Sequence, residues 1–298
     1  MASGSTEVRD APPSLLGRYA RSVAGSLLPG RPGLLPTRRL ALREVEVDVD
    51  HLARYARVCG YRLGSALPAT YPHVLGFPLE LELMSDRSFP FAVLGIVHVA
   101  NRIEQLEPVR VDARPTVTVH AEGLRPHRRG TRFDLVTEVG LDGGVVWREH
   151  STYLHPGDGD PDAPREPAPG EGAAGGEVVA SWPVPGDIGR RYAAVSGDRN
   201  PIHIHALTAK PFGFGGAIAH GMWSKARCLA ALEARLPDAY EAAVEFRSPL
   251  RIPTRARFRL GQADRGYRFV LEPTSGSERP YLQGFAGRLG VRESVDHD

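Results

Sequence analysis

The feature that most constrains the fold is a repeated segment of thirteen residues. Asp50–Arg62 and Asp187–Arg199 are identical at seven of these thirteen positions when they are aligned at a constant offset of 137 residues. Both copies begin with Asp, which favours the N-cap of a helix, and both carry a Gly near the end, which favours the position just after a helix. The chain is therefore expected to contain two related halves, each with the same short helix.

Apolar residues recur at helical spacing within both copies, so each helix is expected to bury one face that includes its tyrosine. The residues of this face are Leu52, Tyr55, Ala56 and Cys59 in the first copy, and Ile188, Tyr192 and Val195 in the second.

A break in composition separates the two copies. The stretch Pro156–Gly176 consists almost entirely of Gly, Pro, Ala and acidic residues, without apolar periodicity. Such a stretch is typical of a linker or a long surface loop. We therefore predict an N-terminal half over residues 1–155, a linker over 156–176 and a C-terminal half over 177–298.

The remaining patterns predict helices and antiparallel strands in both halves, which is an α+β fold class. Further helices are expected at Ser14–Leu28, docked on the surface, at Pro78–Met84, and from Gly221 to Leu236, where Pro237 ends the helix. Strands are expected at Phe91–Ile103, Arg114–Glu122, Thr131–Val139, Val145–Leu154, Ala243–Leu260, Tyr267–Pro273 and Tyr281–Val291.

Composition excludes several classes of protein. The 37 basic residues are nearly balanced by 35 acidic ones, without a basic block, so no nucleic-acid partner is expected. No apolar run reaches the length of about 20 residues that a membrane-spanning helix needs. Cys59 and Cys228 are too few for a disulfide framework, and the first forty residues lack the order of a secretion signal. We expect a cytoplasmic protein.

Three polar residues follow the second copy of the repeat. Asp198, Asn200 and His203 are expected in a loop, because Gly197 ends the helix and Pro201 blocks its continuation. A carboxylate and an imidazole on one turning loop can hold and deprotonate a water, as a general acid/base pair does. Structural roles are the alternative: a residue after the helix end for Asp198, an Asx turn for Asn200 and a partly buried histidine for His203.

The first copy of the repeat helps to decide between these roles. Its positions equivalent to Asp198 and His203 are Tyr61 and Ala66, so the helix is kept while the polar residues are not. If the polar residues served only the helix end, both copies should tend to keep them. We therefore expect one chemical half and one structural half.

These residues form part of a recognisable motif. Ser196–His203 reads S-G-D-x-N-P-I-H, and Gly213–Met222 reads G-F-x-x-x-I-A-H-G-M. The two strings resemble the signature of MaoC-like, or hydratase-2, enzymes, which are (R)-specific enoyl-thioester hydratases and dehydratases. The layout of two halves resembles the double hot-dog members of that family. Their fold consists of two antiparallel sheets, each wrapped round a long helix, and only one half keeps the catalytic residues.

The resemblance implies a role for each matching residue. Asp198 and His203 would be the catalytic pair, Asn200 would orient the loop or the water, and the backbone N–H of Gly221 would bind the thioester oxygen. The substrate would be an acyl thioester of coenzyme A or of acyl carrier protein, in fatty-acid metabolism. No cofactor is implied. The spacing of His203, His205 and His220 has some likeness to a metal site, but no supporting ligand is visible, so no metal is expected.

Two other functions remain open from the sequence. A thioester hydrolase on the same fold would need a carboxylate on the long helix, where Glu233 lies about three turns from Gly221. A non-catalytic acyl-thioester-binding protein would be expected to lack the pair of Asp198 and His203. The oligomeric state is expected to be a monomer, as a pseudo-dimer of halves, or a homodimer.

Overall fold

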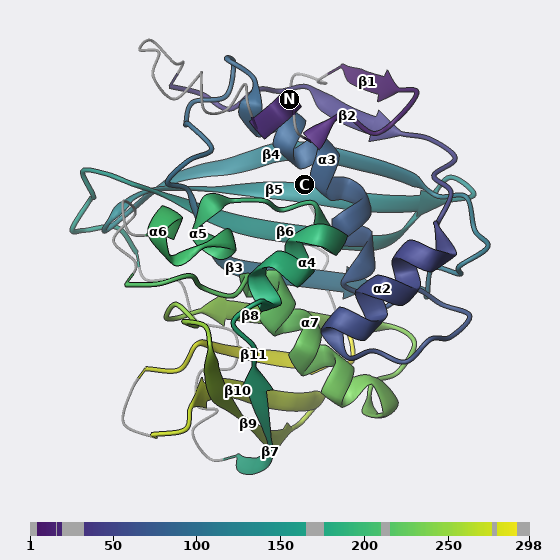
Figure 1. Cartoon of the computed structure of the whole chain (residues 1–298). Coiled ribbons are helices and arrows are strands. Elements are labelled where there is room, and N and C mark those ends of the chain that lie inside the picture. The colour runs from purple at the N-terminus through teal and green to yellow at the C-terminus, as the bar shows by residue number, and fades with distance from the viewer. Residues whose placement is uncertain are drawn as a thin grey trace, which may run out of the picture.

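The strands of the protein form one long sheet. The computed structural model describes residues 5–15, 17–19, 33–164, 176–209, 215–275 and 279–290, and these contain an 11-stranded sheet in the order β1-β2-β4-β5-β6-β3-β8-β11-β10-β9-β7 (Figure 1). The N-terminal half contributes β1 (Thr6–Arg9), β2 (Arg39–Leu42), β3 (Val97–Gln105), β4 (Thr116–His127), β5 (Gly130–Leu141) and β6 (Gly144–Pro156). The C-terminal half contributes β7 (Glu177–Val184), β8 (Tyr240–Phe246), β9 (Thr254–Ala263), β10 (Gly266–Pro273) and β11 (Leu282–Gly287).

The strand order repeats outward from the centre of the sheet. From the centre, the N-terminal half runs β3-β6-β5-β4-β2 and the C-terminal half runs β8-β11-β10-β9-β7, so the two halves have the same topology. We expected two sheets, but antiparallel pairing of β3 with β8 joins them into one, with Ala100–Gln105 opposite Tyr240–Glu245. This pairing satisfies the backbone N–H and C=O groups that two exposed edge strands would otherwise leave open.

The helices lie against one face of this sheet (Figure 1). The N-terminal half has α2 (Val49–Cys59) and α3 (Tyr71–Ser85), and the C-terminal half has α4 (Ile188–Ser196) and α7 (Gly221–Leu232), which a 3-10 turn extends over Glu233–Arg235. Two single-turn helices, α5 (Pro201–Ile204) and α6 (Ala206–Ala209), follow α4. Helix α3 contacts β4 and β5, and α7 contacts β10 and β11. None of the helices within the described ranges is long and apolar enough to cross a membrane.

The repeat forms the helices that we expected. Gly60 and Gly197 end α2 and α4 in the left-handed conformation, at φ 84° and 78°. Tyr55 and Tyr192, which are equivalent in the repeat, are both buried and meet between α2 and α4 with their ring centroids 6.2 Å apart. One predicted cap is wrong: Asp48, not Asp50, is the N-cap of α2, because its carboxylate accepts a hydrogen bond from the N–H of His51.

Tertiary packing changes the bounds of several elements that we predicted. The helix expected at Pro78–Met84 spans Tyr71–Ser85 and continues through Pro78, because thirteen of its fifteen residues are buried and its contacts outweigh the lost hydrogen bond. The first part of the expected strand Phe91–Ile103 is a turn, and the strand begins at Val97. The expected strand Ala243–Leu260 is two strands, separated by a turn that contains the cis bond before Pro253.

Some predictions concern residues that the structure describes only in part. Of the predicted helix Ser14–Leu28, Leu15 and residues 17–19 are helical, and residues 16 and 20–28 lie outside the described residues. Residues 165–175 of the predicted linker also lie outside them. The short strands β1, β2 and β7 were not predicted.

A network of buried polar side chains lies over the junction of β3 and β8. Lys225 of α7 is fully buried, and its ammonium donates to the Oδ1 of Asn101 on β3 and to the backbone oxygen of Ala242 on β8, at 2.9 Å from the latter. The amide nitrogen of Asn101 donates in turn to Glu149 on β6 at 2.6 Å, and Glu149 contacts the imidazole of His73 on α3 at 2.9 Å.

Opposite charges stabilise this network against the cost of burial. Burial lowers the pKa of Lys225 to about 7, and the nearby Glu149 acts in the opposite direction. Burial also acts to lower the pKa of His73, but Glu149, with Glu80 and Asp198, outweighs burial and raises that pKa to about 9. The network therefore links α7 of the C-terminal half to β3, β6 and α3 of the N-terminal half through buried groups whose opposite charges stabilise one another.

Replacement of Lys225 alone should destabilise the protein more than replacement of Lys225 and Glu149 together. We expect Lys225→Met to lower the free energy of unfolding by about 2–4 kcal/mol, because Asn101 and Ala242 lose their buried donor and the carboxylate of Glu149 loses one of its two nearby cations. Lys225→Met combined with Glu149→Gln should recover part of this loss, because the buried negative charge is then removed as well. Urea unfolding of the two single variants and the double variant measures both effects. Strictly additive losses would contradict this coupling.

Candidate active site

The loop that carries Asp198 and Asn200 begins where helix α4 ends. After Gly197, the chain turns through Asp198 to Asn200, whose side-chain oxygen accepts a hydrogen bond from the N–H of Ile202 at 3.3 Å and so caps α5. Pro201 occupies the first turn of α5, where its missing N–H costs nothing. The prediction of a loop for His203 is therefore wrong in one respect: His203 lies on the single turn of α5, which begins at Pro201.

The two oxygens of the Asp198 carboxylate have different partners. Oδ1 accepts hydrogen bonds from the hydroxyl of Tyr19 and from the N–H of Asn200, both at 3.0 Å. Oδ2 faces the Nε2 of His220 at 3.7 Å, and the side chain of Asp198 keeps 29% of its exposure. Burial acts to raise the pKa of Asp198, but His220, His203 and these donors outweigh it and hold the pKa below its usual value. Asp198 is therefore ionised at neutral pH.

His203 is buried, and its orientation is fixed by the backbone. Its Nδ1 lies 2.9 Å from the backbone oxygen of Ile218, to which it donates. Burial lowers the pKa of His203, while Asp198 acts to raise it. The ring is consequently neutral at pH 7 with its proton on Nδ1, which leaves Nε2 as the nitrogen that can accept a proton.

His220 is a site residue that the sequence did not assign to the chemistry, because we considered it only as a metal ligand. It is the N-cap of α7, and its Nε2 donates to the backbone oxygen of Asp198 at 3.0 Å. Its ring stacks on that of His203 with the centroids 3.7 Å apart. Burial and the neighbouring His203 lower the pKa of His220 to about 3, so it stays neutral. The signal in the sequence was its position directly before Gly221.

Gly221 is the first residue of α7, as expected. The first N–H groups of a helix have no partner within the helix, and the helix dipole adds a partial positive charge there. A Cβ atom at Gly221 would lie 2.9 Å from the ring of Phe246, so the space beside this position is closed on one side by an aromatic residue. Gly213 and Phe214, at the start of the second part of the motif, lie outside the described residues.

The structure brings the predicted pair together and adds His220. Ligand atoms of Asp198, His203 and His220 all lie within 4.8 Å of one another. Three such groups could hold a metal ion: Nδ1 of His203 and Nε2 of His220 are hydrogen-bonded to backbone oxygens, which leaves Nε2 of His203 and Nδ1 of His220 as the ring nitrogens that could serve as ligands. His205, the third histidine of that spacing, is exposed. The geometry agrees with the expected grouping of a carboxylate with an imidazole.

A second cluster, His73, Glu80 and Glu149, has its ligand atoms within the same distance of one another. Hydrogen bonds already use these groups: His73 contacts Glu149, and Glu80 accepts from the hydroxyl of Thr137 at 2.8 Å. This cluster belongs to the buried network between the halves.

The equivalent positions in the N-terminal half hold no such pair. Tyr61 replaces Asp198 and shares a hydrogen bond with the hydroxyl of Thr70 at 3.0 Å, and Ala66 replaces His203. Helix α3 of this half nevertheless reaches the start of the loop that carries Asp198, where Phe77 lies beside Gly197. The N-terminal half thus supports the loop without repeating its acid/base pair.

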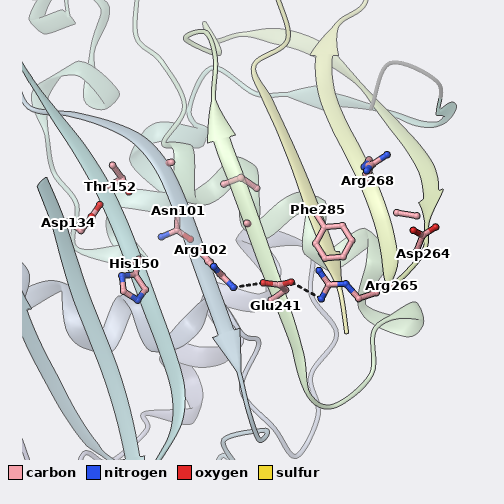
Figure 2. A pocket seen from close by; sticks show the side chains of 14 residues that line it. Asn101, Arg102, Asp134, His150, Thr152, Glu241, Asp264, Arg265, Arg268 and Phe285 are labelled. Carbon is pink, nitrogen blue, oxygen red and sulfur yellow. Dashed lines mark hydrogen bonds and ion pairs between the residues drawn. The ribbon is translucent and has the colours of Figure 1, made fainter. Parts of the chain in front are cut away.

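A hollow of about 600 Å³ lies elsewhere, on the outer face of the sheet. Figure 2 shows Glu241 at its centre, paired with Arg102 at 2.7 Å and with Arg265 at 3.3 Å. Arg102 follows Asn101 on β3 and therefore points to the opposite face from the helices. This surface is not part of the site around Asp198.

Comparison with known proteins identifies the family. A family model described as MaoC like domain matches residues 178–269. The 3-hydroxyacyl-thioester dehydratase X of Mycobacterium tuberculosis is 39% identical over 264 residues, which are 87% of this chain and 93% of that protein. The chain therefore belongs to the MaoC-like dehydratase family.

Solved structures agree with the fold. The crystal structure of HtdX of Mycobacterium tuberculosis superposes with a TM-score of 0.74 at 37% identity, and covers 85% of this chain and 100% of that one. A conserved hypothetical protein of the same organism, described as having a double hotdog fold, superposes with a TM-score of 0.52 at 15% identity, over 82% of this chain and 93% of that one. The double hot-dog fold and the hydratase-type enzyme class that the motif predicted are confirmed.

Proposed function

We propose that the protein interconverts (3R)-hydroxyacyl thioesters and trans-2-enoyl thioesters by loss or addition of water. The observation that carries this proposal is the ionised carboxylate of Asp198 beside the neutral imidazole of His203, next to the first turn of α7. The relative with 39% identity is named a 3-hydroxyacyl-thioester dehydratase, which supports the same reaction here.

In hydration, Asp198 and the Nε2 of His203 would hold one water molecule. Its oxygen bonds to C3 of the enoyl thioester and one of its protons passes to the pair, which delivers a proton to C2 as the double bond is lost and so returns to its starting state. Dehydration runs through the same steps in reverse. Asn200 would keep the loop in place, because its N–H binds Oδ1 of Asp198 while its side chain caps α5.

The first turn of α7 would bind the thioester oxygen. Negative charge develops on that oxygen as an enolate-like state forms, and the backbone N–H of Gly221 lies at a helix N-terminus, which favours such charge. Glycine also allows close approach of the thioester to the backbone.

We propose that the N-terminal half supplies the wall along which the acyl chain lies. The ring of Phe246, beside Gly221, packs against His98 with the centroids 5.0 Å apart, and His98 stacks on Tyr153 at 4.6 Å. Tyr153 in turn stacks on Phe133 at 5.6 Å. This aromatic row leads from the start of α7 into strands of the N-terminal half. The boundaries 1–155, 156–176 and 177–298 remain our proposal for this division.

The substrate carrier would be coenzyme A or acyl carrier protein. We propose a monomer, as a pseudo-dimer of halves, or a homodimer, in the cytoplasm. Cys59 and Cys228 are free and buried, which is consistent with a reducing compartment.

The hydrolase alternative has less support in the structure. Glu233, the carboxylate that it would need, is exposed and accepts a hydrogen bond from the N–H of Arg62 at 3.3 Å. A purely binding protein is also disfavoured, because the acid/base pair is intact and hydrogen-bonded into place.

Loss of either member of the pair should abolish most of the activity. We expect Asp198→Asn and His203→Ala each to lower kcat for crotonyl-CoA hydration by at least about 10²-fold, the lower range for a positioned acid or base. The double variant should lose much less than the product of the two effects, because both groups act on one water. The fold should survive, because the N-terminal half forms the same helix with Tyr61 and Ala66. Near-full activity of either single variant would overturn the assignment.

Gly221 is tested by a pair of variants that separate its N–H from its packing. Gly221→Ala should lower kcat by about 10²-fold, because a methyl group displaces the thioester oxygen from the N–H. The same methyl group also meets Phe246, so Phe246→Leu with Gly221→Ala makes room for it. We expect thermal melting of this double variant to be close to that of Phe246→Leu, while kcat stays low. Recovery of kcat would show that the clash with Phe246, not the N–H, caused the loss.

A further inference from the structure

The beginning of the chain contacts the catalytic loop at several points. Leu15 packs against Gly197, where a Cβ atom would collide with it. The guanidinium of Arg18 lies 3.0 Å from the carboxylate of Glu82 on α3. Tyr19 lies one residue further on and reaches Asp198 itself. These three residues, which we call the N-terminal contact, dock the start of the chain on both halves at once.

Tyr19 makes two hydrogen bonds with consecutive residues of the loop. Its hydroxyl donates to Oδ1 of Asp198 at 3.0 Å and accepts from the N–H of Arg199 at 2.8 Å. Burial and the carboxylate of Asp198 both raise the pKa of Tyr19, so the hydroxyl keeps its proton and remains a donor. One hydroxyl therefore holds both the side chain of Asp198 and the peptide group that follows it.

These contacts make the two carboxylate oxygens unequal. Oδ1 takes two donors, Tyr19 and the N–H of Asn200, whereas Oδ2 is turned toward His220 at 3.7 Å. A carboxylate that is free to rotate would present either oxygen to the reacting water. Fixing Oδ1 removes that freedom, because the second oxygen must then point toward the two histidines.

We propose that Tyr19 is a positioning residue for the reaction, which holds Oδ1 of Asp198 so that Oδ2 faces the water and the histidines. The inference rests on the proposed function and extends it. Tyr19 lies outside residues 178–269, where the family model matches, and it precedes both copies of the repeat in the sequence. The active site is thus completed by a segment that belongs to neither copy of the repeat.

The pH dependence of activity provides a readout that a merely structural role would not change. Asp198 is faced by His203 and His220, and by Tyr19 and the N–H of Asn200. Its charge is also felt by further buried groups, namely Tyr153, Tyr192, His73 and Glu80. Of these groups, only Tyr19 is altered by the variant below. The hydroxyl of Tyr19 stabilises the ionised carboxylate, so its loss should raise the pKa of Asp198.

The experiment compares Tyr19→Phe with the unmodified enzyme on crotonyl-CoA. We expect kcat to fall about tenfold, the effect of one hydrogen bond to a charged group, with KM changed by less than about twofold. The acid limb of the pH profile of kcat/KM should move to higher pH. In the Asp198→Asn background, Tyr19→Phe should cause no further loss, because the group through which it acts is gone.

Arg18→Gln is the matched control. It breaks the ion pair with Glu82 and so weakens the docking of the same segment, but it leaves the hydroxyl of Tyr19 in place. We expect its pH profile to match that of the unmodified enzyme. If Arg18→Gln and Tyr19→Phe gave the same kcat and the same pH profile, Tyr19 would serve docking alone.

The other outcomes separate this inference from the proposed function. A normal kcat and pH profile for Tyr19→Phe, with an inactive Asp198→Asn, would overturn the role of Tyr19 only. A higher kcat/KM for Tyr19→Phe would show instead that the N-terminal contact covers the site, and would also overturn the inference. Full activity of Asp198→Asn would overturn the proposed function.

Discussion

The pairing of β3 with β8 is the interaction on which the rest of the structure depends. It joins the six strands of the N-terminal half and the five of the C-terminal half into one sheet, with the described helices on one face. The buried ammonium of Lys225 reinforces this junction, because it binds Asn101 on β3 and the backbone of β8 at the same time. The relative position of the halves is therefore set by hydrogen bonds that need an accurate fit, as well as by apolar packing.

This fixed position allows the two halves to divide their roles. Both keep the capped helix of the repeat, and the equivalent tyrosines Tyr55 and Tyr192 meet between them. Only the C-terminal half carries Asp198 and His203, the pair that we propose as acid and base. The N-terminal half has Tyr61 and Ala66 in place of these polar residues, and contributes Phe77 beside Gly197. In a scaffold duplicated in this way, one copy can lack the polar residues after the helix, because the helix does not depend on the residues that follow it.

Local signals in the sequence predicted the parts of the structure that local chemistry determines. The glycine caps Gly60 and Gly197, the start of α7 at Gly221 and the grouping of Asp198 with His203 follow from residue types at short spacing. Helix α3 could not be predicted in full, because its continuation through Pro78 depends on burial on nearly all sides. The division of Ala243–Leu260 into two strands likewise depends on a turn that alternation does not reveal.

The two site residues that the sequence did not reveal are set by contacts between distant parts of the chain. Tyr19 is 179 residues from Asp198, and no spacing rule connects them. His220 was visible beside Gly221, but its hydrogen bond to the backbone of Asp198 depends on how α7 enters the fold. Sequence patterns identify residues that act together within a motif, whereas supports from other elements require the three-dimensional structure.

The most direct test of the account is the reaction of crotonyl-CoA, followed at the absorbance band of the enoyl thioester. The account predicts that the band disappears without release of free thiol, and that chiral analysis finds (3R)-hydroxybutyryl-CoA as the product. Disappearance of the band with free thiol would show hydrolysis and contradict the account. Formation of the (3S) product would contradict it as well, because the reaction would then use a different arrangement of water and substrate at Asp198 and His203.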